Sequence, residues 1–164
     1  PKLLCLSEPV AVAAHLLQKI KKHLFADLNE KRILVLGGGV IGMSAMLLLR
    51  NIYGCEKIDL FDLASSRNKI ASDAGSYIPA PEELKPPVGT DYASLYAAAK
   101  YDIVIETTGA ASVFANALYL VKPGGILGCL GMSSSAEIAQ KLIVTKGLLL
   151  IGSIGGTASN GISS

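Results

Sequence analysis

Residues 33–42 read ILVLGGGVIG, and this stretch decides how the chain folds. Its first four residues form a continuous apolar run, which is typical of a strand buried on both faces of a parallel sheet. The glycines after it satisfy the pattern G-x-G-x-x-G, and residues 40–50 have helical spacing. The stretch therefore predicts a strand, a tight turn at Gly37, open backbone at Gly39 where a ligand can approach, and a helix that packs closely through Gly42.

Strand and helix patterns alternate along the rest of the chain. Apolar runs bounded by turn residues predict six strands, at residues 33–36, 58–61, 77–78, 103–105, 126–130 and 148–151. Helical spacing predicts helices at residues 10–23, 40–50, 65–74, 92–100, 112–120 and 136–145. This alternation predicts an α/β Rossmann fold, with a doubly wound, six-stranded parallel sheet and helices on both faces.

The domain organisation follows from the same pattern. We assign residues 1–30 to an amphipathic entry helix that joins from a catalytic domain absent from this sequence, and we expect its buried face to hold Val10, Ala14, Leu17 and Ile20. Residues 31–156 are assigned to the Rossmann domain, and residues 157–164 to a frayed tail or cut linker. We also expect the segment KPGG, residues 122–125, to form a tight turn before the fifth strand.

Composition excludes several classes of partner. The net charge is only +2 and no block of like charges occurs, which excludes a nucleic-acid partner. The most apolar stretch, residues 33–49, contains glycines and is shorter than the roughly 18 residues of a membrane-spanning helix. The first residues of the sequence lack the pattern of a signal peptide, and we therefore expect a cytoplasmic location. Three widely spaced cysteines, Cys5, Cys55 and Cys129, argue against disulfides and a Cys-rich zinc site.

The predicted site begins at the helix that follows the glycine turn. Backbone N–H groups near Val40 and Ile41 would bind a diphosphate at the positive end of the helix. Asp62 ends the second predicted strand about 20 residues after Gly42, where an acid would accept hydrogen bonds from the adenosine ribose. Its charge would repel the 2′-phosphate of NADP, so NAD is preferred, although Arg67 acts in the opposite direction. The alternatives are a ligand-free turn and an Asp62 that only caps a helix or turn.

Six segments occur in a distinctive order along the chain: SEPV at 7–10, the glycine turn, DLASSR at 62–67, DIVIETTG at 102–109, KPGGIL at 122–127 and IGSIGG at 151–156. In this order they resemble the nucleotide-binding domain of the medium-chain, zinc-dependent alcohol and polyol dehydrogenases. Val40 departs from the family, where many members have proline. The resemblance implies that Leu63 and Arg67 flank the ribose site and that Thr107, Thr108 and Gly109 line the adenosine side. It implies nicotinamide-side backbone contacts from Leu130, Gly131, Ser153, Ile154 and Gly155.

The same resemblance implies chemistry that this chain does not complete. In that family a catalytic zinc polarises the oxygen of an alcohol, polyol or sugar, and the substrate passes hydride to the nicotinamide ring. The principal zinc ligands lie in a separate domain, and only Glu8, in a Glu-Pro segment, corresponds to a residue near the zinc. We therefore assign no catalytic residue here. Relatives also pair through an edge strand, so the strand at 148–151 makes a homo-oligomer possible.

Three other interpretations remain to be compared with the structure. The chain could be a non-catalytic NAD-sensing module, or a methyltransferase, since S-adenosylmethionine sites also use a glycine turn and an acid. Tyr96 and Lys100 match the Y-x-x-x-K pair of short-chain dehydrogenases. They precede the fourth predicted strand, whereas that family has the pair after the fifth, which argues against this role.

His15 and His23 lie two helical turns apart, too far for one metal ion.

Overall fold

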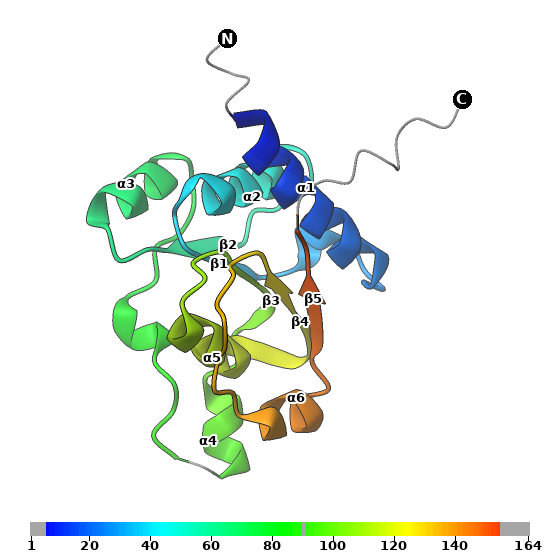
Figure 1. The fold of residues 1–164 in the computed structure, drawn as a ribbon, viewed down its shortest axis with the longest axis vertical. Helices are drawn as coiled ribbons and strands as arrows, with labels where there is room; N and C mark the ends of the chain where they lie inside the picture. The colour runs from blue at the N-terminus through cyan, green and yellow to red at the C-terminus, as the bar shows by residue number, and fades with distance from the viewer. Residues whose placement is uncertain (1–5, 90, 155–164) are drawn as a thin grey trace.

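A parallel sheet of five strands forms the centre of the protein (Figure 1). The computed structural model describes residues 6–89 and 91–154. The strand order is β2-β1-β3-β4-β5, and every neighbouring pair is parallel. The strands are β1 (Ile33–Leu36), β2 (Ile58–Phe61), β3 (Tyr101–Glu106), β4 (Val121–Cys129) and β5 (Leu149–Gly152). The predicted doubly wound Rossmann architecture is confirmed.

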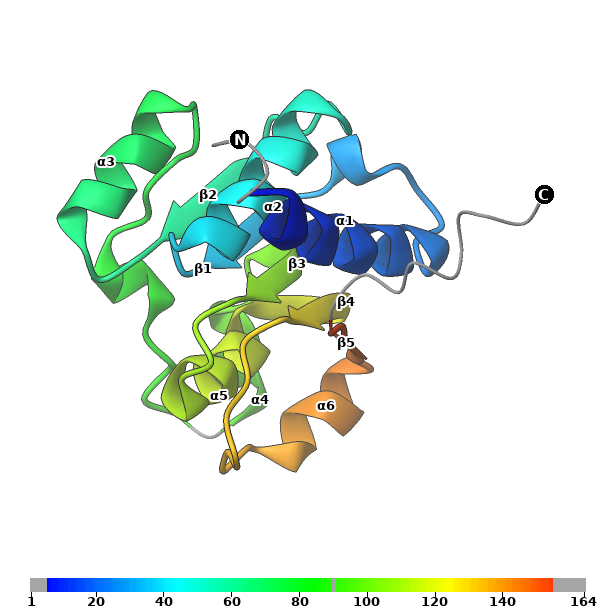
Figure 2. The same ribbon diagram turned by 45° about the horizontal axis from the view of Figure 1, so that its top comes forward.

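Helices cover both faces of the sheet, as the alternating pattern predicts. They are α1 (Ser7–Lys22), α2 (Val40–Asn51), α3 (Ser65–Asp73), α4 (Tyr92–Ala97), α5 (Ala111–Leu120) and α6 (Gln140–Lys146). Figure 2 shows α1 and α2 on one side of the sheet and α4, α5 and α6 on the other. Alternate strand residues supply two cores, so Ile103 and Ile105 pack on the first side and Val104 on the second. Within the described residues, none of the helices combines the length and apolarity needed to cross a membrane.

The third predicted strand, at residues 77–78, is wrong, because the structure has only an isolated bridge there. Tyr77 forms a single parallel bridge with Asp59 beside β2, through the N–H of Tyr77 to the carbonyl of Ile58 and the N–H of Leu60 to the carbonyl of Tyr77. Pro79 and Pro81 follow immediately. Because proline has no N–H to donate, these residues cannot extend the ladder. Among the described residues, the sheet therefore ends at β2, with a single bridge in place of the predicted strand.

The predicted turn at residues 122–125 lies inside β4 rather than before it. Tyr101 pairs with Val121, and the next ladder pair joins Ile103 to Ile126, so the extra residues bulge out of β4. Gly124 provides the left-handed backbone of this bulge, with φ +71°. Helix α6 also differs from the prediction, because it begins at Gln140 instead of at residue 136.

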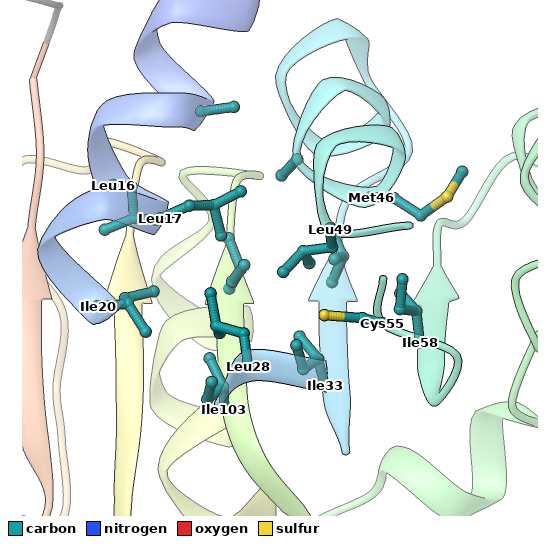
Figure 3. Close-up of a cluster of buried hydrophobic side chains, with 14 of the residues drawn as sticks. Leu16, Leu17, Ile20, Leu28, Ile33, Met46, Leu49, Cys55, Ile58 and Ile103 are labelled. Carbon is teal, nitrogen blue, oxygen red and sulfur yellow. The ribbon is translucent and has the colours of Figure 1, made fainter. Parts of the chain in front are cut away.

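Helix α1 packs on α2 and on the sheet as part of the first core (Figure 3). Its buried apolar residues are Val12, Ala13, Leu16, Leu17 and Ile20, so the predicted face is partly wrong. Helix α1 approaches the sheet closely at Gly128, where an added Cβ would lie 3.0 Å from Leu16 Cδ2. The assignment of residues 1–30 as a joining segment stays a prediction, but the buried residues of α1 are part of the same core as those of α2 and the sheet. The predicted tail, residues 157–164, lies outside the described residues.

We predict that Leu16→Ala lowers the free energy of unfolding by about 2–5 kcal/mol, because it leaves a cavity under a fully buried side chain. Urea denaturation followed by circular dichroism measures this change. Val10→Ala, on the exposed side of the same helix, is the control and should change stability by less than about 0.5 kcal/mol. Equal effects from the two variants would mean that α1 does not pack on the sheet in solution.

Candidate nucleotide-binding site

A cleft of about 550 Å³ lies at the carboxyl ends of β1, β2 and β3. The sheet order reverses direction at β1, which has β2 on one side and β3 on the other. In open α/β sheets, ligands bind outside the carboxyl ends of the strands at such a point. The cleft is lined by Leu36, Gly37, Gly39, Phe61, Asp62, Leu63, Ala64, Arg67, Thr107, Thr108, Ala110 and Val113. The structure thus brings together seven of the predicted site residues.

Glycine is required at two positions of the turn and leaves open space at a third. Gly37 has a φ of +101°, and a Cβ there would lie 2.5 Å from Thr107 Oγ1. A Cβ on Gly42 would lie 1.9 Å from the carbonyl oxygen of Gly37. By contrast, no atom lies within 4 Å of a Cβ placed on Gly39. The fold itself therefore requires Gly37 and Gly42, whereas Gly39 borders a space into which a ligand can fit.

The amino end of α2 faces this space. Gly39 caps the helix, and its carbonyl accepts the N–H of Met43. The N–H groups of Val40, Ile41 and Gly42 lie in the first helical turn and have no acceptor within the helix. They also carry the positive end of the helix dipole, and Val40 is half exposed, as an anion site requires.

Asp62 connects the glycine turn to the loop after β2. Its Oδ2 accepts the N–H of Gly38 at 2.7 Å, and its Oδ1 accepts the N–H of Ala64 at 2.8 Å. Burial alone would raise the pKa of Asp62, but these two bonds and the neighbouring Arg67 outweigh burial and lower the pKa below its ordinary value. Asp62 therefore has the turn role that was the alternative interpretation. A carboxylate oxygen can accept more than one hydrogen bond, so Oδ1 also retains room for a sugar hydroxyl.

Arg67 and Leu63 lie at the rim of the cleft. The guanidinium Nη1 of Arg67 is 3.3 Å from Asp62 Oδ2, and more than half of its side chain is exposed. Leu63 is almost fully exposed. The rim thus presents an apolar side chain beside a carboxylate that is already paired with a cation.

The two threonines after β3 use their hydroxyls inside the protein. Thr107 Oγ1 donates to the carbonyl of Leu36 at 2.9 Å. Thr108 Oγ1 donates to the carboxylate of Glu106 and accepts the N–H of Ala110. Gly109, at φ +70°, has the left-handed backbone that this turn needs. Both threonines line the cleft, as predicted, but their hydroxyls hold the turns in place.

Sequence reasoning missed Glu106 and the apolar cleft residues. The motif at residues 102–109 gave Glu106 no role of its own, yet this residue is buried and organises the turn that contains Thr108. Its position as a charged residue directly after a buried apolar strand was the available signal. Phe61, Ala110 and Val113 add apolar lining to the cleft. Nothing in their local sequence indicated this role.

The residues predicted for the nicotinamide side lie outside this cleft. The N–H groups of Leu130 and Gly131 both donate to the carbonyl of Glu106, so only their own carbonyls remain for a ligand. Ser153 donates its N–H to Cys129, and its Oγ lies 3.3 Å from His15 Nδ1. Ile154 is largely exposed. Gly155 lies outside the described residues.

No zinc site is formed by residues 6–89 and 91–154, because they contain no group of three or more His, Cys, Asp or Glu side chains that could hold a metal ion. Glu8 is an exposed residue in the first turn of α1. Cys55 and Cys129 are free thiols. Burial raises the pKa of each thiol to about 11, so both remain protonated near neutral pH.

The Tyr96 and Lys100 side chains do not act together. The hydroxyl of Tyr96 donates to the carbonyl of Thr145 at 2.8 Å, whereas the Lys100 ammonium lies 3.4 Å from the Glu83 carboxylate. These separate partners agree with the expectation that the pair is not a short-chain dehydrogenase site.

The fold and cleft define a nucleotide-binding domain of the Rossmann type. A profile of the family described as zinc-binding dehydrogenase matches residues 40–163. The chain belongs to the zinc-binding dehydrogenase family and corresponds to the nucleotide-binding domain of that family. The predicted resemblance is thereby confirmed. No curated protein sequence matches the chain.

Several solved structures share this fold. L-idonate 5-dehydrogenase from Escherichia coli is 22% identical, with a TM-score of 0.77 over 96% of this chain and 43% of that enzyme. 2R,3R-butanediol dehydrogenase from Bacillus subtilis is 26% identical, with a TM-score of 0.73 over 92% of this chain and 42% of that enzyme. S. aureus TarJ in complex with NADPH is 25% identical, with a TM-score of 0.73 over 92% of this chain and 44% of TarJ. The chain spans less than half the length of each enzyme.

We predict that Gly42→Ala destabilises the domain by about 1–3 kcal/mol, because the added methyl group overlaps the Gly37 carbonyl and forces α2 away from β1. Thermal and urea unfolding measure the loss. Gly39→Ala is the matched control: its φ of −70° suits alanine and its methyl group meets no atom, so stability should stay equal or rise by about 0.4–1 kcal/mol. A stable Gly42→Ala variant would contradict the close contact.

Proposed function

We propose that the chain binds NAD(H) as the nucleotide-binding part of a zinc-dependent oxidoreductase that acts on an alcohol, a polyol or a sugar. The observation that carries this proposal is the amino end of α2 beside the open space at Gly39, with Asp62 in the wall of the same cleft. Unpaired N–H groups attract a diphosphate, and a nearby carboxylate accepts hydrogen bonds from ribose. Family membership favours this interpretation over a methyltransferase.

The described residues fit a dinucleotide along the cleft. The N–H groups of Val40 and Ile41 would bind the diphosphate, while Gly39 lets it approach without a side chain in the way. Asp62 Oδ1 would accept a hydroxyl of the adenosine ribose, and Phe61 and Val113 would contact the adenosine. The carbonyls of Leu130 and Gly131, with residues 153–155, would face the nicotinamide end. Bound NAD would supply the ring that accepts a hydride.

The remaining parts of the reaction would come from a second domain. Because the described residues form no metal site, we propose that zinc and substrate are bound mainly by another domain of a longer enzyme, with residues 1–30 as the connection. Glu8 is the candidate to approach that zinc from this side. The length of the two dehydrogenases with the same fold supports this proposal, since each is more than twice as long as this chain.

The edge of the sheet is the proposed contact between copies of the enzyme. Among the described residues, strand β5 has a neighbouring strand only on the β4 side, and Leu149 is partly exposed. An apolar edge strand offers unpaired backbone groups to a second copy. We therefore retain the homo-oligomer as a proposal.

Asp62 and Arg67 act in opposite directions on the choice between NAD and NADP. The carboxylate would repel the 2′-phosphate of NADP, and its hydrogen bonds to Gly38 and Ala64 hold it in the wall of the cleft. The guanidinium of Arg67 would attract the same phosphate, but it is already paired with Asp62 and is more exposed to solvent. TarJ has been solved with NADPH, so this fold can also accommodate a nucleotide that carries the 2′-phosphate. The more buried charge favours NAD here.

We predict that the chain binds NADH at least tenfold more tightly than NADPH, which corresponds to about 1.4 kcal/mol. Titration followed by the fluorescence of the reduced nicotinamide measures both dissociation constants. Gly39→Ala should weaken binding of both nucleotides without lowering the melting temperature, because its methyl group occupies the space proposed for the diphosphate. Equal affinities would overturn the role of Asp62, and an unaffected Gly39→Ala variant would place the diphosphate elsewhere.

We also predict that the isolated 164-residue chain oxidises no alcohol or polyol, because the described residues provide neither a zinc site nor a second wall for the cleft. Absorbance at 340 nm with NAD, zinc and a panel of polyols measures turnover. Robust zinc-stimulated reduction of NAD by the purified chain would show that this domain binds the substrate on its own.

A further inference from the structure

Glu106 is a buried acid at the centre of the sheet, and no cation pairs with it among the residues that the structure describes. Its exposed fraction is 1%, and it ends β3 opposite Leu36 of β1 and Cys129 of β4. Burying a carboxyl group costs free energy unless hydrogen bonds compensate for the lost water. Its partners therefore show what this position does.

The side chain of Glu106 holds the turn that follows β3. Its Oε1 accepts the N–H of Thr108 at 2.6 Å, the N–H of Gly109 at 3.0 Å and the hydroxyl of Thr108. Thr108 lines the cleft, and Gly109 comes directly before the cleft residue Ala110. The conformation of this cleft wall thus depends on one carboxyl oxygen.

The same residue also holds the turn that follows β4. The main-chain carbonyl of Glu106 accepts the N–H of Leu130 at 2.9 Å and that of Gly131 at 3.1 Å. A Cβ on Gly131 would lie 2.4 Å from Glu106 Oε2 and 2.1 Å from the nitrogen of Gly109. The two turns therefore contact each other closely, with the Glu106 carboxyl group against Gly131.

We propose that Glu106 is a positioning residue that holds the turns after β3 and β4 in register and so shapes one wall of the nucleotide cleft. This inference rests on the proposed function, because it assigns Glu106 a part in binding NAD(H). Glu106 acts through the backbone of Thr108, Gly109 and Gly131 and need not touch the nucleotide. Preorganised turns lower the entropy that the protein loses when a ligand binds.

Three substitutions of Glu106 separate the effect of side-chain length from the effect of side-chain charge. Glu106→Ala removes the acceptor, and Glu106→Asp keeps the charge but shortens the side chain by one methylene, so both should weaken NADH binding at least tenfold. Glu106→Gln keeps an acceptor oxygen at the same reach and should bind NADH within about threefold of the parent protein. Fluorescence titration with NADH measures all three. If Glu106→Ala does not fold, the difference in NADH affinity between Glu106→Asp and Glu106→Gln still tests the proposal.

A matched control distinguishes positioning from general stability. Asp102, at the other end of β3, accepts the N–H of Arg32 at 2.8 Å and pairs with Lys122 at 3.0 Å. Asp102→Ala should lower the melting temperature but leave the dissociation constant for NADH unchanged. Equal weakening by Asp102→Ala and Glu106→Ala would overturn the proposal, as would a Gln variant as weak as the Ala variant.

Amide hydrogen exchange without nucleotide tests the positioning independently of binding. The N–H groups of Thr108 and Gly109 should be protected in the parent protein and in Glu106→Gln, and should exchange faster in Glu106→Asp. Lost protection with unchanged NADH affinity overturns the inference and leaves the proposed function intact. If the parent protein binds no NADH, the proposed function fails, and this inference fails with it.

Discussion

Helix α2 begins so close to the end of β1 that no side chain fits between them, and the other parts of the site depend on this contact. A Cβ on Gly42 would overlap the Gly37 carbonyl, and a Cβ on Gly37 would overlap the Thr107 hydroxyl. Thr107 in turn donates to the carbonyl of Leu36, which joins β3 to the same turn. Close backbone packing thus brings the unpaired N–H groups of α2 to the point where three strands end.

Two acids at strand ends complete the cleft by accepting hydrogen bonds from the backbone. Asp62 after β2 accepts from Gly38 and Ala64, and Glu106 at the end of β3 accepts from the turn that contains Thr108. Carboxylates form strong hydrogen bonds to N–H groups, so each acid stabilises the turn that it contacts. The cleft is consequently shaped before a ligand arrives, which reduces the ordering cost of binding.

Secondary-structure predictions were most accurate where the local sequence pattern was clearest. Short, mainly apolar runs bounded by turn residues correctly located the strands at 33–36 and 58–61, because this pattern is typical of strands buried in a parallel sheet. Tyr77 failed to start a strand since the prolines after it cannot donate. The face of α1 was partly misassigned because residues 9–14, PVAVAA, are apolar on every side, and only packing against Gly128 and its neighbours selects the buried face.

The sequence by itself determined the order of strands and helices, the position of the glycine turn and the presence of an acid after β2, because these depend on residue spacing along a few turns of chain. Only the tertiary structure decided which polar atoms remain free. Asp62 bonds to Gly38 across 24 positions and Thr107 to Leu36 across 71, so their partners come from other strands. Spacing along the chain cannot specify such contacts, because they form only when the sheet brings strand ends together.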